Sequence, residues 1–138
     1  MKNLFIILFI LPIFLFSNQN EKKDDIEISY YENGQIKSEI PYKNGVLDGK
    51  WIWYFENGQI WYEENYKNGK QDGKSNYYYK DGQIMLEKNF KDGEKDGKWI
   101  FYYENGQIWN VENYTDGKEV GKWTQYNGDG TIKEVKEY

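Results

Sequence analysis

Pairs of carboxylates are the side chains of this sequence whose spacing could indicate catalysis. Adjacent carboxylates occur at Asp24-Asp25 and Glu63-Glu64, and acid–base catalysis is the chemistry that such pairs perform. Neighbouring residues of a strand point to opposite faces, so Glu63 and Glu64 cannot flank one bond. Asp24 and Asp25 belong to a charged run that is typical of a solvated segment. We therefore predict that the protein is not an enzyme.

Three residue types that many active sites require are missing from the sequence. The 138 residues include no Cys, no His and no Arg, which excludes Ser-His and Cys-His nucleophiles, His- or Cys-ligated metals and bidentate Arg contacts to phosphate. The expected turns contain aspartates, but none lies in the alternating-acid loop that Ca²⁺ prefers. We expect no metal and no cofactor; the aspartates in question are Asp48, Asp72, Asp92, Asp96 and Asp116.

The composition favours binding or structure over catalysis. Aromatic residues make up 20% of the chain, and 23 acidic residues against 18 lysines give a net charge of −5. A net negative charge opposes attraction to nucleic acid and to anionic membrane surfaces. Neither is therefore an expected partner.

The first residues are typical of a secretory signal peptide. Lys2 precedes an uncharged run over 4–16, which is too short to span a bilayer, and a polar stretch follows Ser17. We predict a signal peptide over 1–17, a charged linker over 18–27 and a repeat domain over 28–138. The protein is then exported to the periplasm, the cell surface or the medium, and it contacts a membrane only if the peptide stays uncleaved.

Glycine recurs with a fixed period of 24 residues. One series is Gly34, Gly58, Gly82, Gly106 and Gly130, and two further series begin at Gly45 and Gly49, so that thirteen of the fourteen glycines fall on three series. A period of this length is typical of repeat proteins, in which each unit is one supersecondary element packed on its neighbours. About four and a half units follow one another.

Each unit predicts a β-hairpin. Asn57-Gly58 separates two runs of aromatic and β-branched residues, which predicts a two-residue type I′ turn with positive φ at both positions. The segment 68–73 supplies further reversals before the next strand. No 3.6-residue apolar period follows residue 17, so the predicted fold is all-β, an elongated antiparallel meander.

The same residues resemble the MORN repeat, and more closely the variant found in bacterial YwqK-type proteins, some of which are labelled antitoxins. The resemblance covers about 28–138 and implies an elongated, curved sheet with one hairpin per unit and a role in protein or lipid contact. It rests on two motifs, Gly49-Lys50-Trp51-x-x-Tyr54-x-x-Asn57-Gly58-Gln59-Ile60 and Tyr66-Lys67-Asn68-Gly69-x-x-Asp72-Gly73.

A two-residue turn at Asn57-Gly58 would place one set of large side chains on a common core face. Trp53 would oppose Tyr62, and Phe55 would oppose Ile60. Three charged residues of this face are expected near an edge of the sheet. The expected core set is Trp51, Trp53, Phe55, Ile60, Tyr62 and Tyr66, and the three charged residues are Glu64, Lys88 and Glu112.

The opposite face carries a tyrosine every 24 residues. With the same turn, Tyr54 would oppose Trp61, and the equivalent partners in the next two units are Met85 and Trp109. Large apolar groups on a solvent face are typical of a recognition surface, whereas cross-strand aromatic pairs can also serve stability alone. The predicted binding residues are Tyr54, Trp61, Tyr78, Met85, Tyr102 and Trp109.

These features predict an exported, non-catalytic module that binds another protein. Two alternatives stay open, a glycan-binding surface module and an antitoxin- or immunity-type protein that neutralises one partner. Tyr and Trp rings suit protein and sugar surfaces alike. Pairing between the outer strands of two copies is a route to homo-oligomers.

Overall fold

The computed structural model describes residues 24–138, which form one antiparallel sheet. The predicted signal peptide over 1–17 and most of the predicted linker lie outside the described residues. The all-β prediction is confirmed: every regular element from residue 24 onward is a strand, and none of this part of the chain is a helix that could cross a membrane. The first strand begins at Asp25.

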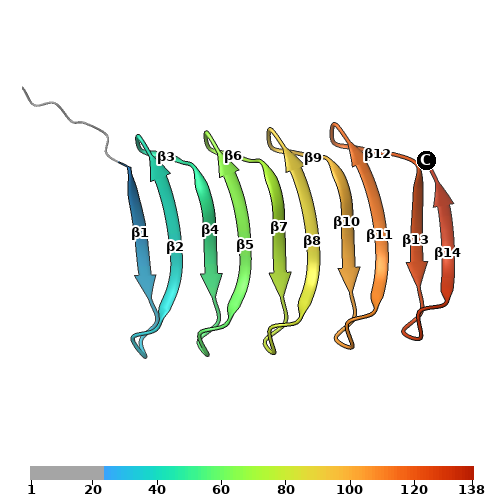
Figure 1. Ribbon diagram of the computed structural model, residues 1–138, viewed down its shortest axis with the longest axis horizontal. Helices are drawn as coiled ribbons and strands as arrows, with labels where there is room; N and C mark the ends of the chain where they lie inside the picture. Colours follow the sequence, from blue (N-terminus) through green and yellow to red (C-terminus); the bar gives the residue numbers. More distant parts are fainter. Residues whose placement is uncertain (1–23) are drawn as a thin grey trace, which may run out of the picture.

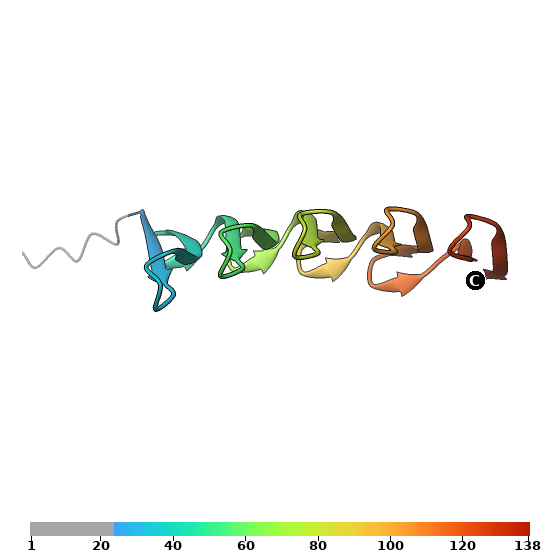
Figure 2. The same ribbon diagram turned by 90° about the horizontal axis from the view of Figure 1, so that it is seen from below.

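Five long hairpins lie side by side along the longest axis, in the order of the sequence (Figures 1 and 2). Their strands pair in sequence order, and a two-residue strand pairs with the end of each of the first four hairpins. The long strands are β1 (Asp25–Tyr30), β2 (Ile36–Lys43), β4 (Gly49–Tyr54), β5 (Ile60–Lys67), β7 (Gly73–Tyr78), β8 (Ile84–Lys91), β10 (Gly97–Tyr102), β11 (Ile108–Thr115), β13 (Lys122–Tyr126) and β14 (Ile132–Glu137). The short strands are β3 (Val46–Leu47), β6 (Lys70–Gln71), β9 (Glu94–Lys95) and β12 (Lys118–Glu119).

The turn inside each hairpin differs from the predicted type I′. In β4–β5, Gly58 N donates to Phe55 O at 2.9 Å and Phe55 N donates to Gln59 O at 2.8 Å. Gly58 has a φ of 84°, and Asn57 is not among the residues with positive φ. This is a three-residue loop in which a type I turn ends at a glycine in the left-handed region. The Asn57 side chain accepts a hydrogen bond from Gln59 N at 3.1 Å, which stabilises the turn.

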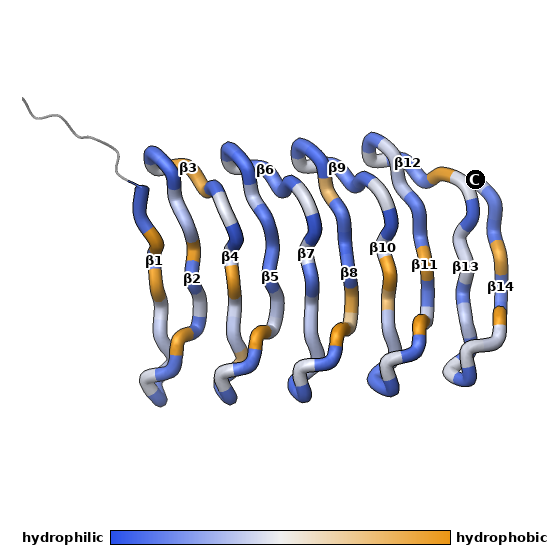
Figure 3. Tube along the Cα trace, viewed as in Figure 1, coloured by the Kyte–Doolittle hydropathy of each residue, from blue (hydrophilic) through white to orange (hydrophobic). Residues whose placement is uncertain are grey.

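The type I′ geometry occurs instead in the row of turns at the other end of the hairpins, where each hairpin connects to the next. Asn68 and Gly69 have φ values of 50° and 79°, and they connect the paired residues Lys67 and Lys70. The equivalent positions of the other units also hold an Asn-Gly or Asp-Gly pair with positive φ at both residues. The tips of both rows of turns are hydrophilic, and most of the apolar residues lie within the strands (Figure 3).

The longer turn changes the register beside it, so part of the predicted facing is wrong. Trp53 pairs with Tyr62 as predicted, but Tyr54 pairs with Ile60, and Trp61 is the extra residue of a β-bulge. Since successive strand residues face opposite sides, a one-residue slip moves Ile60 from the predicted core face to the face of Tyr54. The other hairpins have the same bulge.

The predicted core is only partly buried. Trp99 and Tyr114, with 8% and 6% exposure, are the buried large hydrophobic residues of the described chain. The polar residues Ser38, Glu64 and Ser75 are similarly buried, with 2%, 7% and 0% exposure. A single sheet has no second layer to cover either face, so its large side chains stay half-exposed. The three charged residues expected near an edge lie in mid-strand on inner strands: Glu64 pairs with Trp51, Lys88 with Ser75 and Glu112 with Trp99.

Candidate functional site

One side of the sheet carries a nearly continuous set of aromatic rings, which we call the aromatic face. The rings contact their neighbours within and between hairpins: the Trp53 and Tyr62 ring centres lie 5.9 Å apart, and those of Tyr62 and Tyr77 lie 5.5 Å apart. Most of these side chains are half-buried. The face consists of Trp51, Trp53, Tyr62, Tyr66, Tyr77, Phe90, Trp99, Phe101, Tyr114 and Trp123.

Charged side chains alternate with the rings of this face. Glu64 is 7% exposed and accepts hydrogen bonds from the Tyr66 hydroxyl at 2.8 Å and from the Tyr77 hydroxyl. Burial, together with the hydrogen bond to Glu64, raises the pKa of both tyrosines. In the fourth hairpin, Glu112 accepts a hydrogen bond from the Tyr114 hydroxyl at 2.9 Å. The carboxylates therefore orient the rings around them.

Lysine side chains lie over several rings of the aromatic face. Lys88 Nζ lies 4.3 Å from the ring centre of Tyr77 and 5.1 Å from that of Trp99. It occupies the region where Ser75, fully buried, replaces the tryptophan found at this position in the neighbouring units. Burial lowers the pKa of Lys88. Cation–π contacts of this kind show that the rings attract ammonium groups.

The other side of the sheet carries a ladder of tyrosines and glutamates. The hydroxyls of Tyr54 and Tyr102 donate to Glu39 and Glu87 of the preceding hairpin at 2.9 Å and 3.0 Å. Tyr78 makes the equivalent bond to Glu63 at 3.0 Å. Burial and the adjacent carboxylate raise the pKa of Tyr54 and of Tyr102 to about 12. These predicted binding residues thus link hairpins through their polar tips.

The other predicted binding residues do not lie opposite Tyr54, Tyr78 and Tyr102, because an isoleucine pairs with each of these tyrosines. Trp61 contacts Phe55, with ring centres 5.7 Å apart, and Trp109 contacts Phe101 at 5.6 Å. Met85 takes the same bulge position in the third hairpin. Trp61 and Trp109 are 41% and 40% exposed, so both remain accessible, but they lie beside the turns and not opposite the tyrosines.

A family model for the MORN repeat variant matches four segments that together cover more than half of the sequence. The matched residues are 26–44, 47–68, 71–92 and 95–116. The chain belongs to the MORN repeat variant family. Its fifth hairpin continues the same 24-residue period beyond the matched segments.

Comparison with other proteins adds little to the MORN assignment. No curated protein matches the sequence. Among solved structures, a chain of the crystal structure of the GtfA/B complex bound to UDP and GlcNAc is similar at 15% sequence identity, with a TM-score of 0.32. The match covers 81% of this chain and 24% of that one.

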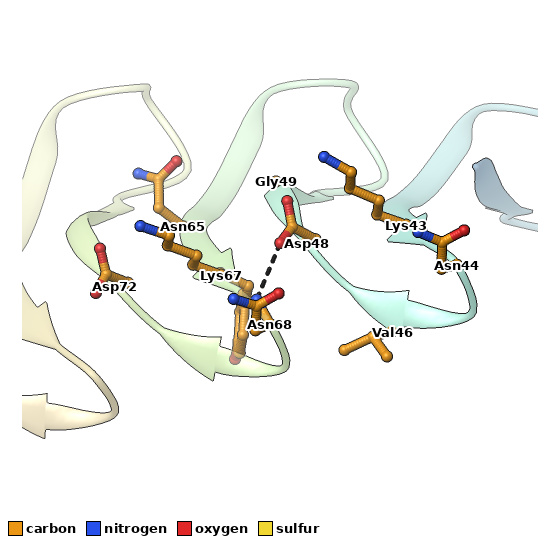
Figure 4. A pocket seen from close by; sticks show the side chains of 10 residues that line it. Lys43, Asn44, Val46, Asp48, Gly49, Asn65, Lys67, Asn68 and Asp72 are labelled. Atoms are coloured by element: carbon orange, nitrogen blue, oxygen red, sulfur yellow. Dashed lines mark hydrogen bonds between the residues drawn. The ribbon is translucent and has the colours of Figure 1, made fainter.

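Each of the two rows of turns contains a hollow. In the row that holds Asn57-Gly58, Trp61, Tyr31 and Phe55 line a hollow of about 480 Å³. A hollow of about 620 Å³ lies in the row of type I′ turns, and most of its lining residues, such as Asp48, are polar. In this hollow Asp48 accepts a hydrogen bond from Asn68 N at 2.9 Å (Figure 4). Residues 24–138 contain no group of three metal-ligating side chains.

Sequence reasoning did not identify the carboxylate clusters of the aromatic face. The signal was present in the repeat alignment, because residues 64, 88, 112 and 136 are Glu, Lys, Glu and Lys at one position of the unit. That position faces the tryptophans across the strand pair. A charged residue opposite a tryptophan in the second, fourth and fifth units predicts ring–charge contacts.

Proposed function

We propose that this MORN repeat protein is a non-catalytic module that binds another protein through its aromatic face, at the cell envelope or outside the cell. The observation that carries the proposal is an uncovered aromatic surface that extends over the second to the fifth hairpin. From residue 24 onward the chain supplies only this sheet and its turns, so no layer formed by these residues lies over the rings. Contiguous half-exposed aromatic surfaces are typical of protein interaction sites.

Support for export comes from the sequence. The basic start, the short apolar run and the polar residues after Ser17 have the order of a cleavable signal peptide. Mass spectrometry of the mature N-terminus tests this part of the proposal. A mature protein that retains Met1 would contradict it.

Site-specific crosslinking tests the binding face. A photoreactive phenylalanine analogue is placed at Tyr62 on the aromatic face, and at Tyr78 on the opposite face as the matched control. We expect a defined protein crosslink from position 62 and none from position 78. Equal crosslinking from both positions, or from neither, would refute the proposed binding face.

Glycan binding is the second candidate, favoured by the exposed indole of Trp61 over its hollow beside Tyr31 and Phe55. A flat ring with a polar tip stacks well on sugars. A polysaccharide array compares the wild type with the W61A/W109A double variant. Retention of a glycan that is lost in the double variant would assign the module to this class. An immunity-type role would give a crosslink to a single protein whose activity the module neutralises.

Self-association through the outer strands is a further prediction of the fold. Within the described chain, β1 and β14 each pair on one side only. Ile26 and Ile28 on β1 are 56% and 44% exposed, and Val135 on β14 is 43% exposed. Unpaired edges of this kind favour strand addition. Light scattering over a concentration series tests whether oligomers form.

A further inference from the structure

Two hairpins of the aromatic face contain the same cluster of a carboxylate, a tyrosine and a tryptophan. In the fourth hairpin, the Tyr114 hydroxyl donates to Glu112 at 2.9 Å, and the ring centres of Tyr114 and Trp99 lie 5.4 Å apart. In the second hairpin, the Tyr66 hydroxyl donates to Glu64 at 2.8 Å, and its ring centre lies 5.9 Å from that of Trp51. The two clusters therefore present nearly the same chemistry, two repeats apart.

A lysine of the chain itself occupies the cluster of the fourth hairpin. Lys95 Nζ lies 4.2 Å from the ring centre of Trp99 and 4.4 Å from that of Tyr114, and it donates to the Tyr114 hydroxyl at 3.2 Å. Two aromatic faces and a nearby carboxylate are a favourable environment for an ammonium group. This cluster is thus a cation site that is filled from within.

The corresponding residue of the second hairpin cannot fill its cluster. Leu47 in β3 holds the position that Lys95 holds in β9, since each is the second residue of its short strand and pairs with the penultimate residue of the preceding long strand. Over residues 24–138, no lysine lies above the Trp51 or Tyr66 ring, and none is within ion-pair distance of Glu64. The tyrosine–carboxylate geometry is kept, but the lysine that faces Glu64 from the next hairpin, Lys88, lies over the rings of Tyr77 and Trp99 and not over those of Trp51 and Tyr66.

We infer that the cluster of Glu64, Tyr66 and Trp51 binds a lysine or arginine side chain of the partner protein. The inference rests on the proposed protein-binding role of the aromatic face, and it names the chemistry of the partner. Charge complementarity supports it: Glu64 is a carboxylate set among rings, and Tyr77 adds a second hydroxyl to it. A basic side chain would lie over the Trp51 and Tyr66 rings as Lys95 lies over those of Trp99 and Tyr114.

Nuclear magnetic resonance provides a direct readout of this site. Trp51 Nε1 has no hydrogen-bond partner in the described structure, so its indole N–H signal reports a new group placed over the ring. The probe is a short synthetic peptide of alternating lysine and glycine, and its control is the same peptide with every lysine acetylated, which removes the charge. We expect the basic peptide to shift the Trp51 signal and the acetylated peptide to leave it in place.

Two pairs of variants separate the cluster from general charge effects. E64Q should weaken binding of the basic peptide about tenfold, whereas E112Q, with the same change of charge at the equivalent position, should change it less than twofold because Lys95 already fills that cluster. L47K should abolish the Trp51 shift by supplying an internal ammonium group, and L47Q should retain it. Circular dichroism confirms that each variant keeps its strands.

Each outcome decides the inference. Equal losses in E64Q and E112Q would attribute binding to net charge, and L47K binding like wild type would show that the peptide lies elsewhere; either result overturns it. A Trp51 shift caused by choline and not by the peptide would assign the cluster to small quaternary ammonium ligands instead. If position 62 still crosslinks to a protein while the basic peptide fails to bind, the protein-binding function stands and this inference fails.

Discussion

Glu63 is the side chain whose removal should most clearly test how the hairpins are held together. It is 15% exposed and accepts hydrogen bonds from Lys50 in its own hairpin at 2.9 Å, and from Asn76 and Tyr78 of the next hairpin at 2.8 Å and 3.0 Å. The ladder between these two hairpins includes only two residue pairs, one of which is Glu63 with Asn76. Side-chain bonds therefore carry much of the contact between them.

The size of the effect follows from these contacts. A hydrogen bond to a charged group contributes about 1.5–3 kcal/mol, and an exposed ion pair such as that with Lys50 contributes about 0–1 kcal/mol. Contributions that share one carboxylate are not additive. We expect E63A to lower the free energy of unfolding by about 3 kcal/mol near neutral pH, with Asn76 and Tyr78 left without their acceptor.

Urea unfolding followed by circular dichroism measures this loss, and its pH dependence provides a second test. Burial favours a higher pKa for Glu63, but the hydrogen bonds from Asn76, Lys50 and Tyr78 outweigh it, so the pKa lies below its ordinary value of 4.5. A carboxyl whose pKa is lowered by folding stabilises the fold at pH values above its pKa in the unfolded chain, and this stabilisation is lost as the pH falls through its pKa in the folded chain. The difference between wild type and E63A should therefore narrow in acid.

The control for this experiment is E104A, because Glu104 is an exposed turn residue. It should change the free energy of unfolding by no more than about 0.5 kcal/mol. A loss below about 1 kcal/mol in E63A near neutral pH would refute the reasoning, given the hydrogen-bond strengths assumed. A difference from wild type that stays undiminished in acid would refute it too.

Three further predictions concern packing, turns and alkaline stability. S75A should be neutral or slightly stabilising in thermal unfolding, because the buried Ser75 hydroxyl has no hydrogen-bond partner in the described structure, whereas S75W should cost about 1–3 kcal/mol by overfilling the site. G49A should destabilise the protein more than G34A in urea unfolding. Both glycines have positive φ, but an added Cβ at Gly49 would lie 3.1 Å from a proline of β2, whereas Gly34 faces open space. Absorbance titration should show Tyr54 and Tyr102 ionising near pH 12. A tyrosine pKa that is raised in the folded state stabilises the fold at pH values below the pKa of the unfolded chain, so the free energy of unfolding should begin to fall above about pH 10.

The fold could be predicted because each repeat encodes it locally and repeats the signal. Asn-Gly and Asp-Gly pairs mark reversals, and the alternation of large and small side chains marks strands. The pairing of Trp53 with Tyr62 followed from these signals. What the sequence did not determine was the loop length at Asn57-Gly58, because a type I turn with a terminal glycine and a type I′ turn accept the same two residues.

The error in the turn explains the error in the site. With a three-residue loop and a bulge, Trp61 leaves the face of Tyr54 and lies beside Phe55. The expectation of a buried core failed for another reason: periodicity shows which residues share a face, but it does not show whether a second layer covers that face. Glu64 was placed near an edge because a charged residue in a core would be costly, and that cost is small on a face that the tyrosine hydroxyls and solvent still reach.

The narrow contact between consecutive hairpins has a consequence for how the protein opens. Each inner hairpin has two neighbours and each terminal hairpin has one within the described chain, and the paired residues between hairpins number only two at each junction. In a linear array of this kind, stability is a sum of local terms, so the ends fray before the centre. Amide hydrogens of β7 and β8 should therefore exchange most slowly. A bound partner that contacts several hairpins would stabilise the array and reduce fraying at its ends.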